Sequence, residues 1–108
     1  MDNEINIIIK NYLKLIRQKY AGINKAFIFG SYAKGNSNQD SDIDLALIFN
    51  ELDDSERFDI QVQLMLMASQ IDSRIEPHPI SFSDLNCGNP FVEEILNTGI
   101  EIQASATN

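Results

Sequence analysis

The sequence has one cysteine, no tryptophan and no long hydrophobic run. A single cysteine cannot form a disulfide within the chain, so a reducing compartment is expected. No apolar run approaches the roughly 20 residues that cross a bilayer. The first residues lack the basic and apolar regions of a signal peptide. We therefore expect a soluble cytoplasmic protein with no attachment to a membrane.

Basic residues are also scarce. Lysine and arginine number 8 against 16 aspartates and glutamates, which gives a net charge of −8. A broad nucleic-acid surface needs clustered lysine and arginine to neutralise phosphates, so direct binding of nucleic acid is not expected. A basic protein partner, or a metal ion with a small anionic ligand, is compatible with this charge.

The length of 108 residues fits one domain. The hydrophobic fraction of 44% is ordinary for a globular protein. We predict a single domain over residues 1–103, followed by a disordered tail over residues 104–108, where the side chains are small and polar.

Hydrophobic spacing predicts two long helices. The first runs from Asn3 to Tyr20 and repeats apolar residues every three or four positions. The second is expected to be capped by Ser55 and to run to about Ile71. Its predicted inward face consists of Phe58, Val62 and Met65, with Leu66 and Ser69 as further candidates.

Short apolar runs predict the strands. Residues 25–29 and 42–49 have the length and composition of buried strands. Residues 74–82 alternate around two prolines, which favours an edge strand. A short helix over 91–97, with Asn89 as its cap and Pro90 at its first position, precedes a last strand over 100–102. This order predicts an α/β (α+β) fold, a small mixed sheet of three to four strands with packed helices.

A Gly-Ser pair ends the first predicted strand. Gly30 permits a backbone conformation closed to other residues and lets a ligand approach closely. Ser31 adds a hydroxyl group, and a helical turn starting there would present backbone N–H groups suited to phosphate oxygens. Such a pair after a strand is more often a simple turn.

Two aspartates open the second predicted strand. Alternate side chains of a strand share a face, so Asp42 and Asp44 would project together, about 6–7 Å apart along the strand. Like charges this close disfavour each other unless a cation lies between them. Carboxylates together with substrate phosphates are a common Mg²⁺ site. The alternative is a solvated strand start in an acidic protein.

The two features together carry a family resemblance. The stretch GSYAKGNSNQDSDIDL resembles the pattern of the DNA-polymerase-β-like nucleotidyltransferases, and among them the minimal nucleotidyltransferases (MNT). In that pattern Gly-Ser is followed after about ten residues by Asp-x-Asp. Ala33-Lys34-Gly35 also matches the Ala-[Arg/Lys]-Gly often found in the loop.

The resemblance implies a role for each motif residue. Gly30 and Ser31 would hold the β- and γ-phosphates of ATP, and Asp42 and Asp44 would bind two Mg²⁺ ions. The family also has a third catalytic carboxylate on a later strand. Glu76 is the candidate here, although the family more often has aspartate at that position.

Three further residues have alternative interpretations. Lys34 could contact the triphosphate or be a solvated loop lysine. Tyr32 could stack on a base, although packing on the first helix is favoured. His78 is predicted to share a strand face with Glu76. It could assist proton transfer or bind metal, but a structural role is the more common outcome for a lone histidine.

The resemblance also implies a partner. Small MNT domains resemble the antitoxin halves of two-gene modules whose partner is a HEPN ribonuclease toxin. The expected reaction transfers AMP from ATP to a hydroxyl of that toxin, and tyrosine is the expected acceptor. Two alternatives remain open: a non-catalytic antitoxin with a vestigial nucleotide site, and a nucleotidyltransferase acting on a small molecule such as an antibiotic.

Overall fold

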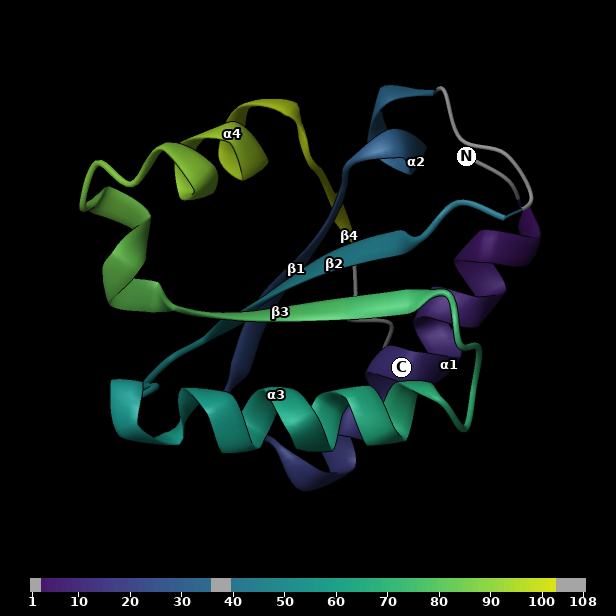
Figure 1. Ribbon diagram of the computed structural model, residues 1–108, viewed down its shortest axis with the longest axis horizontal. Helices are drawn as coiled ribbons and strands as arrows, with labels where there is room; N and C mark the ends of the chain where they lie inside the picture. The colour runs from purple at the N-terminus through teal and green to yellow at the C-terminus, as the bar shows by residue number, and fades with distance from the viewer. Residues whose placement is uncertain (1–2, 36–39, 103–108) are drawn as a thin grey trace.

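The chain folds into a four-stranded mixed sheet with helices on both faces (Figure 1). The computed structural model describes residues 3–35 and 40–102; the tail expected at 104–108 lies outside them. This architecture confirms the predicted fold class. The elements, in chain order, are α1 (Asn3–Lys19), β1 (Ile23–Phe29), α2 (Ser31–Lys34), β2 (Ile43–Phe49), α3 (Asp54–Ala68), β3 (Ile75–Ser81), the 3₁₀ helix η1 (Phe82–Asn86), α4 (Pro90–Thr98) and β4 (Ile100–Ile102).

The sheet has the strand order β3-β2-β1-β4. β1 runs antiparallel to β2 and β4, whereas β2 and β3 are parallel and are connected through α3. In this register Phe29 pairs with Asp44, and Asp44 in turn pairs with Glu76. The end of β1 and the starts of β2 and β3 therefore meet at one end of the sheet.

The first face of the sheet is covered by α1 and α3. It consists of alternate strand residues, among them Ile43, Leu45 and Leu47, which are fully buried. Tyr12 lies in the same core and its hydroxyl donates a hydrogen bond of 2.8 Å to the backbone oxygen of Leu64. Because this bond ties α1 to α3, it fixes the two helices relative to each other.

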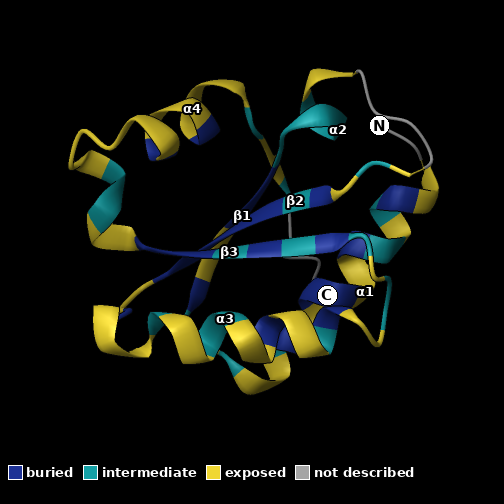
Figure 2. Cartoon of the chain, in the orientation of Figure 1, coloured by how far each residue is buried: buried dark blue, intermediate teal, exposed yellow. Residues whose placement is uncertain are grey.

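The second face is covered over only part of its area. There Phe27, Ala46, Ile48 and Ile80 form an apolar cluster with Val92 and Ile95 of α4. Figure 2 shows the buried middle of the strands and the largely exposed helices around them. The next residues along the same face of β2 and β3 are acidic or imidazole side chains, and they leave this part of the face polar.

Side chains of α3 form hydrogen bonds with the edge strand β3. Pro77 and Pro79 have no N–H group to donate. The carbonyl oxygen of Pro77 accepts a hydrogen bond from Gln61, and that of Pro79 accepts one from Arg57. Since both long side chains come from α3, the helix covers the edge strand and discourages pairing with another chain.

The predicted inward face of α3 was wrong. Phe58 is 77% exposed and Leu66 56% exposed, and Val62, Met65 and Ser69 also face outward. Leu64 and Ala68 are the buried residues. Apolar residues alternate over 58–66, and two residues turn a helix by about 200°, so this pattern puts apolar side chains on opposite sides. The face that turns inward is the one on which Arg57 and Gln61 reach β3.

Other local predictions need smaller corrections. α3 begins at Asp54, because Asp53 and Glu56 form a capping box, whereas Ser55 was the predicted cap. The helix ends at Ala68, three residues before the predicted end. α4 starts as predicted, with Asn89 accepting a hydrogen bond from the Phe91 N–H.

The structure also bears on membrane insertion. Within the part of the chain that the structure describes, no helix combines the length and the apolar character needed to span a membrane.

Candidate active site

The Gly-Ser end of β1 lies directly against Asp44. Gly30 has a φ of +75°, a conformation that favours glycine, and it precedes the short helix α2, which starts at Ser31. A Cβ atom at this position would overlap Oδ2 of Asp44. Glycine is therefore required twice over, for its backbone conformation and for its lack of a side chain. The two halves of the sequence motif are brought into contact.

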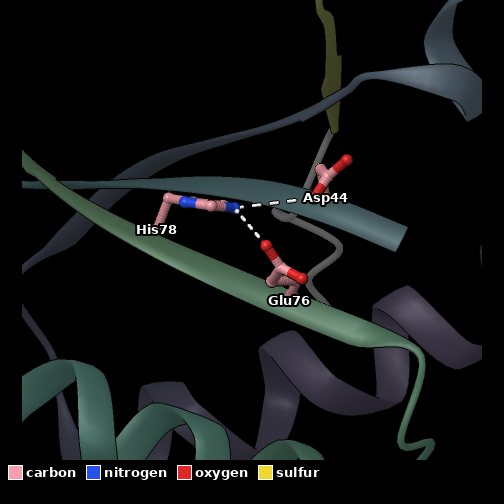
Figure 3. A group of neighbouring side chains, drawn as sticks. All are labelled: Asp44, Glu76 and His78. Atoms are coloured by element: carbon pink, nitrogen blue, oxygen red, sulfur yellow. Dashed lines mark ion pairs between the residues drawn. The ribbon is translucent and has the colours of Figure 1, made fainter. Parts of the chain in front are cut away.

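Asp44, Glu76 and His78 form a cluster on the open part of the second face (Figure 3). Nε2 of His78 lies 3.5 Å from Oδ1 of Asp44 and 3.5 Å from Oε1 of Glu76. One ligand atom from each residue falls within 4.8 Å of the others. Two adjacent parallel strands supply the three side chains, because Asp44 pairs with Glu76 and alternate residues of β3 share a face.

Two phenylalanines hold the His78 ring in place. The ring centroid of His78 lies 5.2 Å from that of Phe29 and 6.0 Å from that of Phe91. The two phenylalanine rings are themselves 5.6 Å apart and nearly perpendicular. Nε2 of His78 is shielded from solvent and makes no hydrogen bond to any of the residues that the structure describes. The packing therefore directs a buried, unpartnered nitrogen towards two carboxylates.

This donor set suits a divalent cation. The carboxylates of Asp44 and Glu76 are hard oxygen donors, and the side chains are 23% and 46% exposed, so a hydrated ion can reach them. Asp42 lies outside the cluster of three. It is exposed and immediately precedes β2, and its role as a metal ligand stays a prediction.

The loop residues of the motif lie at the rim of the site. Nζ of Lys34 forms an exposed ion pair of 3.4 Å with Oε2 of Glu94 on α4. Tyr32 is partly buried against the core that contains α1, which confirms the packing interpretation. A pocket of about 280 Å³ opens beside the cluster and is lined by His78 and by its ring neighbour Phe91. Arg57, Asp84 and Asn89 also line this pocket.

Sequence reasoning missed the aromatic part of the site. Phe29 was assigned only to a strand and Phe91 only to a helix, and nothing in the local pattern of either residue pointed to a site. A usable signal did exist for His78, because it lies two residues after Glu76 on an alternating strand. Its expected face is the one observed, but a structural role had been favoured.

Curated relatives match about half of the chain. A protein provisionally named protein adenylyltransferase MJ0604, from Methanocaldococcus jannaschii, is 39% identical over 54% of this chain and 58% of its own length. Protein adenylyltransferase MntA from Thermococcus cleftensis is 35% identical over 45% of this chain and 48% of its own length. The matches thus span about half the length of these relatives.

Solved structures share the fold over a larger share of the chain. A toxin–antitoxin structure with AMP-PNP matches with a TM-score of 0.58 and 24% identity, over 85% of this chain and 70% of that one. A structure of the tri-AMPylated Shewanella oneidensis HEPN toxin with MNT antitoxin matches with a TM-score of 0.53 and 20% identity, over 88% of this chain and 68% of that one.

The family comparison covers most of the chain. The family described as polymerase beta, nucleotidyltransferase matches residues 10–107 of this chain, a range that includes all the motif and cluster residues. This agrees with the resemblance first seen in the Gly-Ser and Asp-x-Asp spacing. The chain belongs to the polymerase beta nucleotidyltransferase family.

Proposed function

We propose that this chain is an MNT antitoxin that transfers AMP from ATP to a tyrosine hydroxyl of a HEPN toxin. The observation that carries the proposal is the contact between the Gly-Ser end of β1 and Asp44, which itself lies beside Glu76. A site for phosphates and a site for cations are thereby joined. This is the arrangement that nucleotidyl transfer needs, because such catalysis consists mainly of positioning and charge neutralisation.

In this proposal Asp42, Asp44 and Glu76 hold two Mg²⁺ ions. Bound Mg²⁺ would neutralise negative charge on the triphosphate and polarise its phosphoryl oxygens. The fit rests on the two carboxylates of the cluster, which are hard oxygen donors on adjacent strands. Asp42 is two residues from Asp44 along the chain, and its exposure leaves it accessible to a second ion.

The phosphates would bind at the start of α2. Gly30 lets the backbone pass close to the ligand, and the first N–H groups of a helix have no carbonyl partner within that helix. Ser31 would donate its hydroxyl to a phosphate oxygen. Lys34 would exchange its ion pair with Glu94 for the triphosphate. That exchange costs little, since an exposed pair is worth less than about 1 kcal/mol.

The acceptor and partner are supported by relatives. MntA of T. cleftensis is named a protein adenylyltransferase, and the S. oneidensis structure pairs an MNT antitoxin with a tri-AMPylated HEPN toxin. The net charge of −8 favours a basic partner. The pocket beside His78 and Phe91 offers an acceptor side chain a place next to the cluster. ATP is consumed, so we place the reaction in the cytoplasm.

The alternative with specific support is a non-catalytic antitoxin. The third carboxylate is Glu76 where the family more often has aspartate, and its side chain is 46% exposed. If Glu76 cannot complete the site, the chain would bind its toxin and ATP without transfer. A small-molecule nucleotidyltransferase is a weaker alternative, because solved structures that share this fold include toxin–antitoxin complexes.

Label transfer tests the proposal. The untagged chain is incubated with purified HEPN partner, Mg²⁺ and α-³²P-ATP, and labelled partner is measured after gel separation. We expect label in the partner with the wild type and none with the double variant Asp42→Asn, Asp44→Asn. Absence of label, together with neutralisation of the toxin that survives in the double variant, would show a binding antitoxin. Labelling of an antibiotic in place of the partner would show the small-molecule enzyme.

A further inference from the structure

The imidazole of His78 is placed as a metal ligand. Its Nε2 atom is shielded from solvent, has no hydrogen-bond partner among residues 3–35 and 40–102, and faces Asp44 and Glu76 at 3.5 Å each. A charge-assisted hydrogen bond between an imidazolium and a carboxylate would be shorter, about 2.7–2.9 Å. The nitrogen is therefore close enough to bind the same ion as both carboxylates. It is too far from either carboxylate for a charge-assisted hydrogen bond.

We propose that Asp44, Glu76 and His78 bind one divalent ion together, and that His78 makes this position favour a first-row transition metal over Mg²⁺. The proposal rests on the proposed function in one respect, that Asp44 and Glu76 are metal ligands. It adds a nitrogen ligand and a metal preference to that site.

The preference follows from ligand chemistry. Mg²⁺ takes oxygen ligands almost exclusively and loses its water reluctantly. Neutral imidazole suits softer ions, and affinity for a site with nitrogen ligands rises from Mn²⁺ through Co²⁺ towards Zn²⁺. Replacing one oxygen ligand by Nε2 thus raises the affinity for these ions more than the affinity for Mg²⁺.

The ring is prepared for this role by its packing. Phe29 and Phe91 contact His78 from two directions. A side chain held by packing loses little further freedom when it binds an ion. No rearrangement of β3 is needed either, because Glu76 and His78 already share one face of the strand.

A single histidine makes a direct spectroscopic test possible. The chain contains one histidine, so an untagged sample labelled with ¹⁵N-histidine gives one pair of imidazole nitrogen signals. One equivalent of Zn²⁺ should shift the Nε2 signal strongly, as expected for direct coordination, whereas one equivalent of Mg²⁺, held by the two carboxylates, should shift it much less. In Asp44→Asn the Zn²⁺ response should require a large excess of metal. If Zn²⁺ does not shift the Nε2 signal of the wild type, the proposal is overturned.

Two variants sharpen the test. His78→Phe keeps an aromatic ring against Phe29 and Phe91 but removes the ligand, and His78→Gln offers an oxygen or amide group in its place. Mn²⁺ affinity is measured from the free-ion electron paramagnetic resonance signal, and Mg²⁺ affinity by competition. Since loss of a residue that merely orients a ligand costs about 10–100-fold in metal affinity, we expect at least a tenfold loss of Mn²⁺ affinity in His78→Phe.

The ratio of affinities decides the outcome. In His78→Gln, the preference for Mn²⁺ over Mg²⁺ should fall by about tenfold, because a nitrogen ligand is replaced by an oxygen ligand. An unchanged ratio in both variants would contradict the proposal. These titrations use no partner and no ATP, so they remain decisive if AMP transfer fails. Conversely, transfer by the wild type in Mg²⁺ alone would uphold the proposed function even if His78 bound nothing.

Discussion

The two faces of the sheet are built from alternate residues of the same strands, yet they differ in what covers them. On the first face Ile43, Leu45 and Leu47 are buried under α1 and α3. On the second face Ala46 and Ile48 are covered by α4, but Asp44 is left partly exposed. Stability and chemistry are thus assigned to opposite sides of one strand. The first face holds most of the hydrophobic core, so it provides the stability that the polar part of the second face does not.

The largest expected effect is a difference in stability between variants of two adjacent residues on β2. Leu45→Ala removes a fully buried side chain from the first face, and such changes cost about 2–5 kcal/mol of unfolding free energy. Asp44→Asn, one residue away, should leave stability unchanged or slightly raised, because it removes repulsion between two carboxylates. Urea unfolding of the two variants measures the contrast. Comparable losses in both would mean that the faces are not divided in this way.

Gly30→Ala should damage the site more than the fold. The added methyl group would displace Asp44, and the φ of +75° adds strain of about 1 kcal/mol or more. Gly35→Ala is the matched control, since Gly35 has a φ of +78° and no described residue places an atom within 4 Å of the added Cβ. Both variants should lose similar stability, but only Gly30→Ala should lose most metal-dependent ATP binding. Equal binding by the two would argue against a role for the contact with Asp44.

Tyr12→Phe tests a single hydrogen bond in the core of the first face. Without the hydroxyl, the backbone oxygen of Leu64 loses this bond between the two helices, at a cost of about 0.5–1.5 kcal/mol. Burial also raises the pKa of the Tyr12 hydroxyl above its ordinary value of about 10. The folded state therefore keeps the proton when the unfolded state loses it, and stability falls as pH rises above about 10.

This pH dependence has its own measurement. The urea midpoint of the wild type should decrease more steeply than that of Tyr12→Phe between pH 9 and pH 11, a range that brackets the ordinary tyrosine pKa of about 10. Identical slopes would show that the Tyr12 hydroxyl ionises as readily in the folded chain as in the unfolded chain.

The smallest effect is expected on the outer side of α3. Phe58 is 77% exposed, so Phe58→Ser should change the unfolding free energy by no more than about 0.5 kcal/mol. The inward face expected from the sequence would instead make this a core substitution costing about 3–5 kcal/mol. Thermal melting of Phe58→Ser beside Leu64→Ala compares the two sides of the helix. A large loss of stability in Phe58→Ser would instead support the inward face predicted from the sequence.

The sequence predicted the helix and strand order well because the local signals were strong. Residues 3–20 keep one helical period, and Pro77 and Pro79 indicated an edge strand, as observed. The buried face of α3 was not predictable, because an alternating apolar pattern puts apolar side chains on two opposite sides of a helix. The choice between them depends on long-range bonds from Arg57 and Gln61 to β3.

The site was predictable only in part, for a similar reason. The meeting of the Gly-Ser end with Asp44 was expected from the family resemblance of the motif, and Glu76 was the candidate that the resemblance implied for a third carboxylate. The contacts of Phe29 and Phe91 with His78 join residues from β1, α4 and β3. No local pattern encodes such a meeting of three elements, so the surroundings of the histidine appear only in the fold.

The melting temperature in the presence of Mg²⁺ and ATP tests the central claim most directly, that the open part of the second face binds a metal–nucleotide complex through Asp44. A ligand that binds only the native state stabilises it, by about 2.7 kcal/mol at one hundred times its dissociation constant. We predict that Mg²⁺ with ATP raises the melting temperature of the wild type and leaves that of Asp44→Ala unchanged. The same rise in both proteins would contradict the account.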